Sequence, residues 1–500
     1  MSTYQELKQE LLASPEKLMM KKPFYREVYD VQGKVCGFLS ERYMNEEITA
    51  QPTTLKVIPV SQDRFVLELN PQSHDVLFDE NVPSITMKLK NGGFADLKFS
   101  RVAVPYQKLI KNKQVLHLTG NPLHHTLLVE NPTDKQRENF ITVKQYWKKR
   151  NQDGMRTKMV DTQKSFGDAG LLYYFDYKGQ VKSRILSYAD GYVLCSHSDD
   201  NGDRILETVV YNKDNVTYID SYDDEYMYRY TNAGNSADEN GWVMEKPVKH
   251  GFNEIPLITK RGKVAWDAVQ SVIETYEVIY NVFLAIQKKY GWGILYIKGN
   301  FDEKGRKLAG NIILNDNSID GKGDAKFLTP PTPENTIDTL QALEDTIQKG
   351  SGTTFILPKD IKMSGDISGI AISLTMSSDI ETALQDCIEW QNVADKMMRL
   401  FKYGLSKELQ KNKIVKNAVT AFADLDIHSE FRVWRPMNEY EFNQMIQMMT
   451  EGGVISYETG TELCTLSKPD EKARLDKEAK EDEERKKREG GSSKNIGFNK

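Results

Sequence analysis

The feature that most constrains the fold of this chain is a long apolar stripe between Ala265 and Tyr290. Apolar side chains recur there every three or four residues, and polar side chains fill the positions between them; the apolar set is Val269, Val272, Ile273, Tyr276, Ile279, Tyr280, Phe283 and Ile286. This period predicts one amphipathic helix of about 26 residues, roughly 40 Å long. Since an average globular helix has about a third to a half of that length, the stripe exceeds what a single small domain can bury.

A second helix is predicted to lie beside the first. Residues 334–350 carry an apolar stripe, with Thr332 as the N-cap and Pro333 at the first helical position, and the pattern ends at Gly350. Between the two helices, residues 291–333 read as a compact insert in which "GILYIKGNF" and "AKFLTPP" are strands around a short helical piece. A small α/β insert therefore connects two helices that can lie side by side.

The C-terminal part contains a third long helical pattern, at 370–409. Within it, Ser378 and Glu381 have the spacing of a capping box, which predicts a kink or a restart of the helix. A late strand at 425–436 needs an earlier partner strand. A further helix is predicted from about 439 to Gly452, and the charged tail reads as a solvated helix that frays into disorder.

The N-terminal half mixes helices and strands. Residues 4–48 look helical, residues 52–132 alternate between strand-like and helical patterns, and a polar helix is predicted at 133–153. Residues 160–232 are rich in aromatic and β-branched residues separated by Asp, Asn and Gly turns, which predicts a sheet of hairpins. Together these patterns indicate the α+β fold class.

Composition narrows the class of function. The formal net charge is −5, which argues against a protein that holds nucleic acid by bulk positive charge. The four cysteines form no CxxC pair and read as thiols in a reducing compartment. The N-terminus has no apolar signal segment, and no apolar run is long enough to cross a membrane, so we expect a cytosolic, soluble protein.

No arrangement of residues predicts catalysis, a metal or a cofactor. The motifs of nucleotide-binding loops, zinc proteases and serine hydrolases are absent from the sequence. Asp199, Asn201 and Asp203 alternate as in a calcium loop, but Gly202 is out of register. A hairpin turn is therefore favoured over an ion site there.

Two other lookalikes have simpler explanations. His124 and His125 lack partnered cysteines, which favours a surface or packing role. The segment 438–466 reads as helix–Gly-Gly–helix, but its second helix has no Arg or Lys to meet phosphates or guanines. A plain helical hairpin is favoured over a DNA-reading helix-turn-helix.

The segment 351–368 is the strongest candidate for a functional element. It contains several glycines and serines, two lysines and two aspartates. A plain solvent loop between helices would explain it equally simply. Its length and its position between two long helices favour a function, because loops of this size are uncommon in compact domains.

An ordered series of segments runs through nearly the whole chain. It comprises "RVAVPYQKLIKNKQVLHLTGNP" (101–122), "GDAGLLYYFDYKGQV" (167–181), "HGFNEIPLI" (250–258), the long helix at 265–290, "TIQKGSGT" (346–353), "SGIAISL" (368–374) and "GGVISYET" (452–459). This series resembles the portal proteins of tailed double-stranded-DNA bacteriophages, specifically the siphophage-type portal family. The resemblance implies a subunit that assembles into a ring, typically of twelve copies, at one capsid vertex.

The resemblance also implies a division of the chain. Residues 1–51 would form an N-terminal helical arm, 52–263 the wing, 264–290 and 334–350 the stem helices, 291–333 the clip, 351–368 the tunnel loop, 369–436 a long kinked helix with a strand returning to the wing, 437–485 the crown, and 486–500 a disordered tail. Genomic double-stranded DNA would be packaged and ejected through the ring. The terminase large subunit and then head–tail adaptors would bind the ring, and capsid and scaffold proteins would be further partners. The subunit would be located at a capsid vertex of the virion and, during assembly, in the host cytoplasm.

Candidate site residues follow from this division. The resemblance implies that the tunnel loop presents Lys359, Asp360, Lys362, Ser364 and Asp366 to DNA, with Gly350, Gly352, Gly365 and Gly369 as hinges. In the clip, Arg306, Lys307, Lys322 and Lys326 would contact partner proteins. Because each lysine–phosphate contact strengthens binding, a few lysines in a near-neutral conduit would touch DNA without gripping it.

Two alternatives to the portal function remain. A phage head or tail adaptor, or a scaffold, would bind DNA or protein as a small oligomer. A cytosolic enzyme with an unrecognised site would show a metal- or nucleotide-dependent thermal shift. The particle mass distinguishes the first of these from a closed ring of roughly a dozen chains.

Overall fold

The computed structural model describes residues 4–19, 27–29, 35–38, 56–61, 64–68, 85–88, 94–97, 104–214, 216–232, 241–290, 294–298, 312–316, 324–328, 334–355, 376–435, 439–457, 460–461, 464 and 474–481. The chain divides into two compact units. The first contains Met1–Phe355 and Ser378–Trp434, and the second contains Ile356–Ser377 and Arg435–Lys500. The chain therefore passes between the units at three places.

The N-terminal segment is only partly helical. Helices α1 (Tyr4–Leu12) and α2 (Pro15–Met19) are followed by an antiparallel hairpin of β1 (Glu27–Tyr29) and β2 (Val35–Phe38). The predicted helical arm at 1–51 is therefore wrong for residues 27–29 and 35–38. The apolar and aromatic residues of "EVY" and "VCGF" flank the turn-forming "VQGK", and such a pattern favours a hairpin.

Two more hairpins precede the first long helices. They are β3 (Lys56–Ser61) with β4 (Arg64–Glu68), and β5 (Ile85–Lys88) with β6 (Phe94–Leu97). Helix α5 (Tyr106–Thr119) follows and stops at Gly120. Strand β7 (His124–Leu127) then leads to α6 (Asp134–Lys149), which begins with a capping box.

The polar helix predicted at 133–153 is two helices. Asn151 has a φ of 49° and separates α6 from α7 (Gln152–Phe166). The sequence pattern placed the start of the hairpin region at 160, whereas its first strand begins at Asp168. Residues 160–166 belong to helix α7 and place Val160 and Phe166 in the core. A short apolar run of this kind reads as a strand or as a buried helix, and propensity alone cannot distinguish the two.

Two antiparallel sheets follow α7. Strand β8 (Asp168–Phe175) lies between β9 (Val181–Leu186) and β16 (Leu257–Arg261). A larger sheet has the order β10 (Val193–Ser198), β11 (Arg204–Lys213), β12 (Val216–Tyr222), β13 (Tyr226–Thr231) and β14 (Val243–Met244), and β15 (Val248–Lys249) also pairs with β13. The predicted sheet of hairpins is confirmed. Asp199 Oδ1 accepts the amides of Asn201 and Asp203 at 3.0 and 2.8 Å, which makes the predicted hairpin turn.

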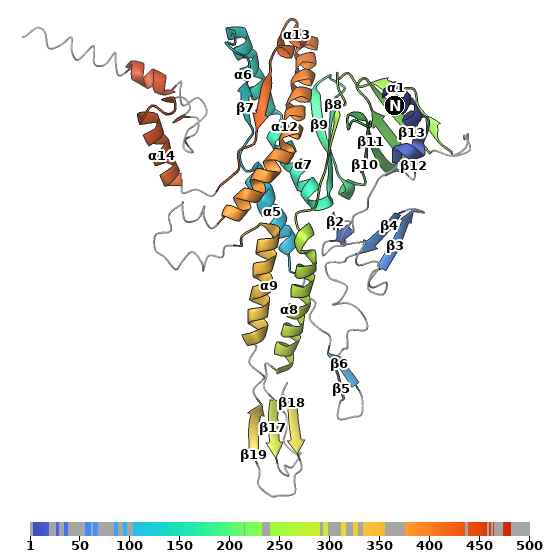
Figure 1. The fold of residues 1–500 in the computed structure, drawn as a ribbon, viewed down its shortest axis with the longest axis vertical. Helices are drawn as coiled ribbons and strands as arrows, with labels where there is room; N and C mark the ends of the chain where they lie inside the picture. Colours follow the sequence, from blue (N-terminus) through green and yellow to red (C-terminus); the bar gives the residue numbers. More distant parts are fainter. Residues whose placement is uncertain are drawn as a thin grey trace, which may run out of the picture. The chain divides into compact units, whose positions relative to one another are not determined.

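The two predicted long helices lie side by side (Figure 1). A 3-10 turn at Asp267–Val269 runs into α8 (Gln270–Tyr290), which packs against α9 (Glu334–Ser351). The insert between them contains β17 (Ile294–Lys298), β18 (Ile312–Asp316) and β19 (Asp324–Leu328), in the order β18-β17-β19. The two strands predicted in the insert correspond to β17 and β19. Strand β18, whose "IILND" pairs parallel to β17, was not predicted.

Helix α12 (Ser377–Lys411) is the longest described element, 35 residues or about 50 Å. It starts next to the predicted capping box, and the residues before 376 lie outside the described part of the chain. The short α13 (Ala418–Ala423) leads to β20 (Ile427–Glu430), which pairs antiparallel with β7. The late strand therefore has the early partner that the sequence required.

The core of the first unit joins distant parts of the chain. Trp147 of α6 meets Phe401 of α12 edge to face, with ring centroids 5.3 Å apart, and also meets the ring of His125. His125 Nδ1 lies 2.9 Å from Ser429 Oγ. Burial lowers the pKa of the His125 imidazole to about 4. The packing role predicted for this histidine is confirmed.

The second unit contains α14 (Glu439–Glu451), which stops before Gly452 as predicted, and a helical stretch at 474–481. None of the helices in the described ranges is long and apolar enough to cross a membrane.

Candidate functional site at the ends of the 356–375 segment

Most of the predicted site residues lie outside the described part of the chain. This applies to Lys359, Asp360, Lys362, Ser364, Gly365, Asp366 and Gly369, and to Arg306, Lys307 and Lys322. Lys326 lies in β19, opposite Tyr296 of β17. Gly350 and Gly352 lie at the end of α9. The structure therefore describes the residues on either side of the 356–375 segment and not the segment itself.

The end of α9 is held against α5 by a buried glutamine. Gln114 Nε2 donates to the carbonyl of Ser351 at 3.1 Å, and it lies 3.4 Å from the carbonyl of Ala265, just before α8. Gln114 is 8% exposed, so water competes little for these bonds. One side chain of α5 thus joins the two neighbouring helices.

Thr354 is fixed through both of its backbone polar groups. Its N–H donates to both carboxylate oxygens of Asp379, each at 3.1 Å, and its carbonyl accepts a hydrogen bond from Lys113 Nζ. Asp379 lies in the first turn of α12, where a carboxylate is favoured by the helix dipole. Burial lowers the pKa of Lys113, and the neighbouring Asp379 opposes that shift.

Phe355 is the last described residue before the segment, and it contacts α5 and α9. Its ring stacks on Tyr106 of α5 with centroids 5.6 Å apart, and Tyr106 meets Tyr276 of α8 edge to face. Its N–H donates to Gln348 Oε1 of α9 at 2.7 Å. Ser351 is the last residue of α9, and Gly352–Phe355 form no helix or strand, as the predicted loop at 351–368 requires. Hydrogen bonds nevertheless tie Thr354 and Phe355 to α5, α9 and α12.

Gly350 and Gly352 have a steric reason to be glycine. A Cβ atom on Gly350 would lie 2.6 Å from Val269 Cγ1. Gly352 has a φ of 59°, and its Cβ atom would lie 2.3 Å from Thr382 Oγ1. Their role as hinges stays a prediction, since close packing at Gly350, and close packing with a left-handed backbone at Gly352, already require glycine.

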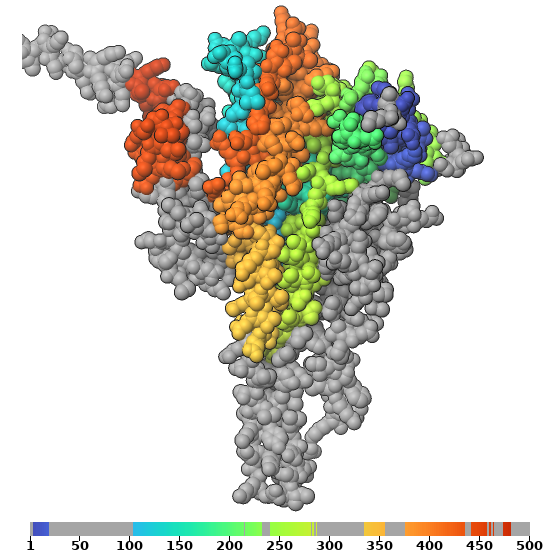
Figure 2. Space-filling model, viewed as in Figure 1, coloured from blue at the N-terminus to red at the C-terminus, as the bar shows by residue number. Residues whose placement is uncertain are grey.

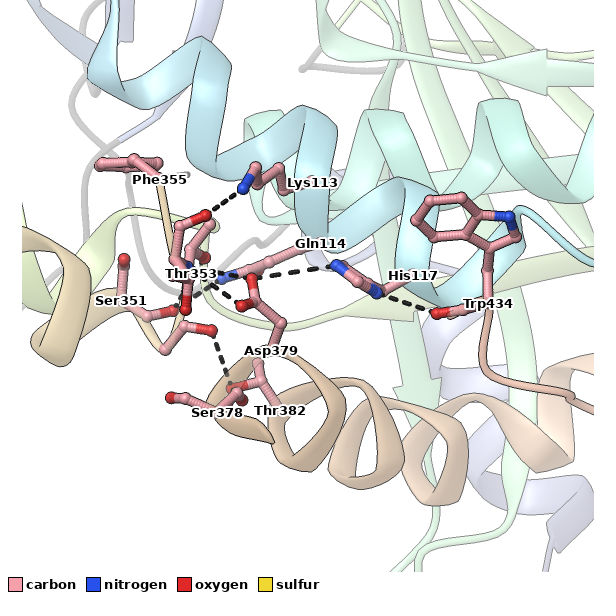
Figure 3. Close-up of polar contacts among 12 residues, drawn as sticks. Lys113, Gln114, His117, Ser351, Thr353, Phe355, Ser378, Asp379, Thr382 and Trp434 are labelled. Carbon is pink, nitrogen blue, oxygen red and sulfur yellow. Dashed lines mark hydrogen bonds and ion pairs between the residues drawn. The ribbon is translucent and has the colours of Figure 1, made fainter. Parts of the chain in front are cut away.

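His117 connects this cluster to the end of β20. Its Nδ1 lies 2.9 Å from the carbonyl of Trp434, and because a carbonyl only accepts, Nδ1 carries the hydrogen. The N–H of Trp434 donates in return to the carbonyl of His117 at 2.7 Å. The other ring nitrogen, Nε2, is 3.9 Å from Asp379 Oδ1 (Figure 3).

The sequence analysis did not identify His117, Gln114 or Asp379 as site residues. A signal was present, since Gln114 and His117 are polar residues among the apolar positions of α5, and Asp379 lies within the predicted capping box. All three places where the chain passes between the units adjoin this cluster, at Phe355, Ser378 and Trp434. We call Lys113, Gln114, His117, Thr354, Asp379 and Trp434 the junction.

The junction positions backbone and has no catalytic arrangement. Its polar groups are used on carbonyl and amide groups of the chain. In the ranges that the structure describes, no group of three or more His, Cys, Asp or Glu residues could hold a metal ion. Long paired helices and side chains that hold backbone groups are features of a structural subunit, in which assembly and positioning are the function.

Comparison with known proteins specifies that class. The sequence profile described as "Phage portal protein, SPP1 Gp6-like" matches residues 96–487, so this chain belongs to the SPP1 Gp6-like family of phage portal proteins. Membership makes it a structural, non-enzymatic component of the virion that assembles as a homo-oligomeric ring. The portal resemblance inferred from the ordered segments is confirmed.

The likeness to solved structures is distant. Solved structures that match include one described as "Neck of empty GTA particle computed with C6 symmetry", with 12% identity over 73% of this chain and 90% of that chain. Its TM-score is 0.35, a likeness too distant to bear on function. No curated protein sequence matches the chain.

Proposed function

We propose that this portal subunit forms a ring of about twelve copies through which double-stranded DNA is packaged and ejected. The terminase large subunit binds the ring during packaging, and head–tail adaptors bind it afterwards, in contact with capsid and scaffold proteins. The observation that supports this best is the junction, which anchors both ends of the 356–375 segment within one network.

Exposed apolar residues on α12 support assembly through this helix. Ile388 is 79% exposed and Leu384 is 48% exposed, one helical turn apart. The first half of α12, in light orange, lies open on the visible face of the first unit (Figure 2). An apolar face of this kind is typical of a surface that a neighbouring subunit covers.

In this proposal, the tunnel loop predicted at 351–368 lines the channel through its residues after Phe355. Lys359 and Lys362 contribute rings of positive charge, and Asp360 and Asp366 keep the local net charge near zero. A few contacts per subunit avoid the steep, salt-dependent binding that many lysines would produce. Ser364, Gly365 and Gly369 give the backbone the freedom to follow passing DNA.

The clip in this proposal is the insert at 291–333. Its three described strands form a small sheet. Arg306, Lys307, Lys322 and Lys326 are proposed to contact partner proteins. Rim charges of this kind mainly steer association and set which partner is accepted. Charge reversal at these positions is therefore expected to slow the binding of the packaging motor more than the assembly of the ring.

Electron microscopy of the purified protein tests the ring directly. A closed ring supports the proposal, and a monomer or dimer would favour an adaptor or a scaffold. For the channel, the double variant Lys359→Glu/Lys362→Glu is expected to lower the yield of packaged DNA. The control Lys135→Glu/Lys148→Glu makes the same charge change on the exposed face of α6. Equal packaging by both variants would refute the DNA contact.

A further inference from the structure

His117 lies between two segments that leave the first unit by different routes. On one side, its Nδ1–H holds the carbonyl of Trp434, the last residue of that unit. On the other side, its Nε2 faces Asp379, which holds the N–H of Thr354, one residue before the chain leaves at Phe355. Among the described residues, this imidazole lies against two anchors: the bond that holds Trp434, and Asp379, which holds Thr354. Lys113 and Gln114 bond only to residues on the 351–354 side and near α8.

The surroundings leave these groups little room to adjust separately. His117 is 2% exposed and Asp379 is 4% exposed, so water cannot readily replace a lost partner. Ring and Cβ atoms of Trp434 lie 2.8 and 2.9 Å from where Gly120 would carry a Cβ atom, which shows how closely Trp434 packs on the end of α5. A displacement at one anchor therefore meets a packed neighbour and not solvent.

The link between His117 and Asp379 is the adjustable one. Its 3.9 Å separation exceeds a direct hydrogen bond by about 1 Å. The Trp434 contacts, at 2.9 and 2.7 Å, are already closed. A small shift of the first turn of α12 is thus enough to make or weaken the contact with the imidazole.

We propose that His117 is a positioning residue that couples the anchor of the 356–375 segment to the anchor of the chain that follows Trp434. Displacement of Thr354 moves Asp379, the Asp379–His117 contact changes, and His117 passes the change to Trp434. Thermodynamic coupling is reciprocal, so a disturbance at 432–434 also reaches Thr354. This coupling gives the portal a path between its channel segment and its C-terminal unit.

The two ring nitrogens allow the path to be cut on either side. His117→Asn keeps a donor near the Nδ1 position for Trp434 and removes the group that faces Asp379. His117→Gln reaches towards Asp379 and loses the donor to Trp434. Asp379→Asn keeps an oxygen for the N–H of Thr354 and removes the charge. Glu381→Gln, on the exposed face of α12, is the matched control for loss of one carboxylate charge.

Hydrogen exchange of single amides in the assembled, full-length protein tests the coupling. Asp379→Asn is expected to speed exchange at Thr354 and also at Trp434, each about tenfold, the size of a typical coupling between sites. In the His117→Asn background, the same change is expected to affect Thr354 alone. Glu381→Gln is expected to change neither amide by more than about twofold.

Either of two results would overturn the proposal. One is an effect of Asp379→Asn that is confined to Thr354 in the otherwise unchanged protein. The other is an effect on Trp434 that persists in the His117→Asn background. If Asp379→Asn does not assemble, Asn121→Ala provides the same test from the other end, because Asn121 Nδ2 lies 3.3 Å from the carbonyls of Arg432 and Val433. It is expected to speed exchange at Thr354, and no effect there would overturn the proposal.

The use of this coupling in DNA packaging rests on the proposed function, and the exchange experiment does not. Packaging by His117→Asn rings is expected to fall below that of the Glu381→Gln control. Coupled exchange with unaltered packaging would refute a role in packaging and leave the coupling standing. Uncoupled exchange would refute the coupling even where the rings package DNA normally.

Discussion

Replacing Gly352 by alanine tests whether the end of α9 is fixed as the structure shows. The residue has a φ of 59°, and a left-handed conformation costs a non-glycine residue about 1 kcal/mol or slightly more. The new Cβ atom would also lie 2.3 Å from Thr382 Oγ1, so the hydroxyl must move. Thr382 is β-branched and stiff at χ1, and it would lose its bond to the carbonyl of Ser378 at 3.0 Å, worth about 1 kcal/mol. The expected total is about 2–3 kcal/mol.

Two variants separate these contributions. Gly191→Ala has the same backbone problem, with a φ of 82°, but nothing lies within 4 Å of its Cβ position, so it is expected to cost about 1 kcal/mol. Thr382→Ala removes the clashing hydroxyl, and in that background Gly352→Ala is also expected to cost about 1 kcal/mol. The assay is the free energy of local opening, measured by native-state hydrogen exchange at the amide of Thr353 for the Gly352 variants and at that of Tyr192 for Gly191→Ala. Gly352→Ala and Gly191→Ala agreeing within about 0.5 kcal/mol would refute the packing of Gly352 against Thr382.

Further predictions concern other parts of the first unit. Burial raises the pKa of Glu277 to about 8, so the folded state binds more protons than the unfolded state between about pH 4.5 and 8; stability therefore falls by up to about 1.4 kcal/mol per pH unit across this window, and Glu277→Gln is expected to abolish that fall in urea titrations at several pH values. Gly404→Ala gains about 1 kcal/mol of helix propensity, but its Cβ atom would lie 2.6 Å from Val181 Cγ2, and overpacking of this kind costs about 1–3 kcal/mol; a lower unfolding midpoint is expected, and a raised midpoint would show that α12 can shift. Arg156 is 1% exposed and donates to the carbonyls of Thr119 and Asn121, so Arg156→Met is expected to cost about 2 kcal/mol, whereas Arg137→Met on the exposed face of α6 should leave the melting temperature unchanged.

Long periodic elements were predictable from the sequence because their signal accumulates over many residues. The stripe from Val269 to Ile286 specified α8, and the end of α9 lies within one residue of the predicted Gly350. Short elements were not predictable in this way. The strand β18 has five residues, and its identity depends on the parallel pairing with β17, which local sequence does not encode.

The residues of the junction were not predictable from local sequence. The glycine-rich pattern after Ser351 predicted a functional loop next to the junction, and that function stays a prediction; pattern alone cannot show which residues are anchored. His117 and Trp434 are separated by 317 residues and meet only because β20 pairs with β7. Contacts of this kind arise from the fold as a whole, so no local sequence motif predicts them.

The pairing of β20 with β7 has a consequence for synthesis. His125 and Ser429, which face each other across these strands, are 304 residues apart in the chain. In the same core, Trp147 packs against Phe401, which also comes much later in the chain. Such non-local contacts form late, after a large loss of chain entropy. On a ribosome, the first unit can close only after residue 430 or so has emerged. Each nascent chain therefore finishes nearly its whole length before it presents complete surfaces to its neighbours, which disfavours rings that incorporate truncated subunits.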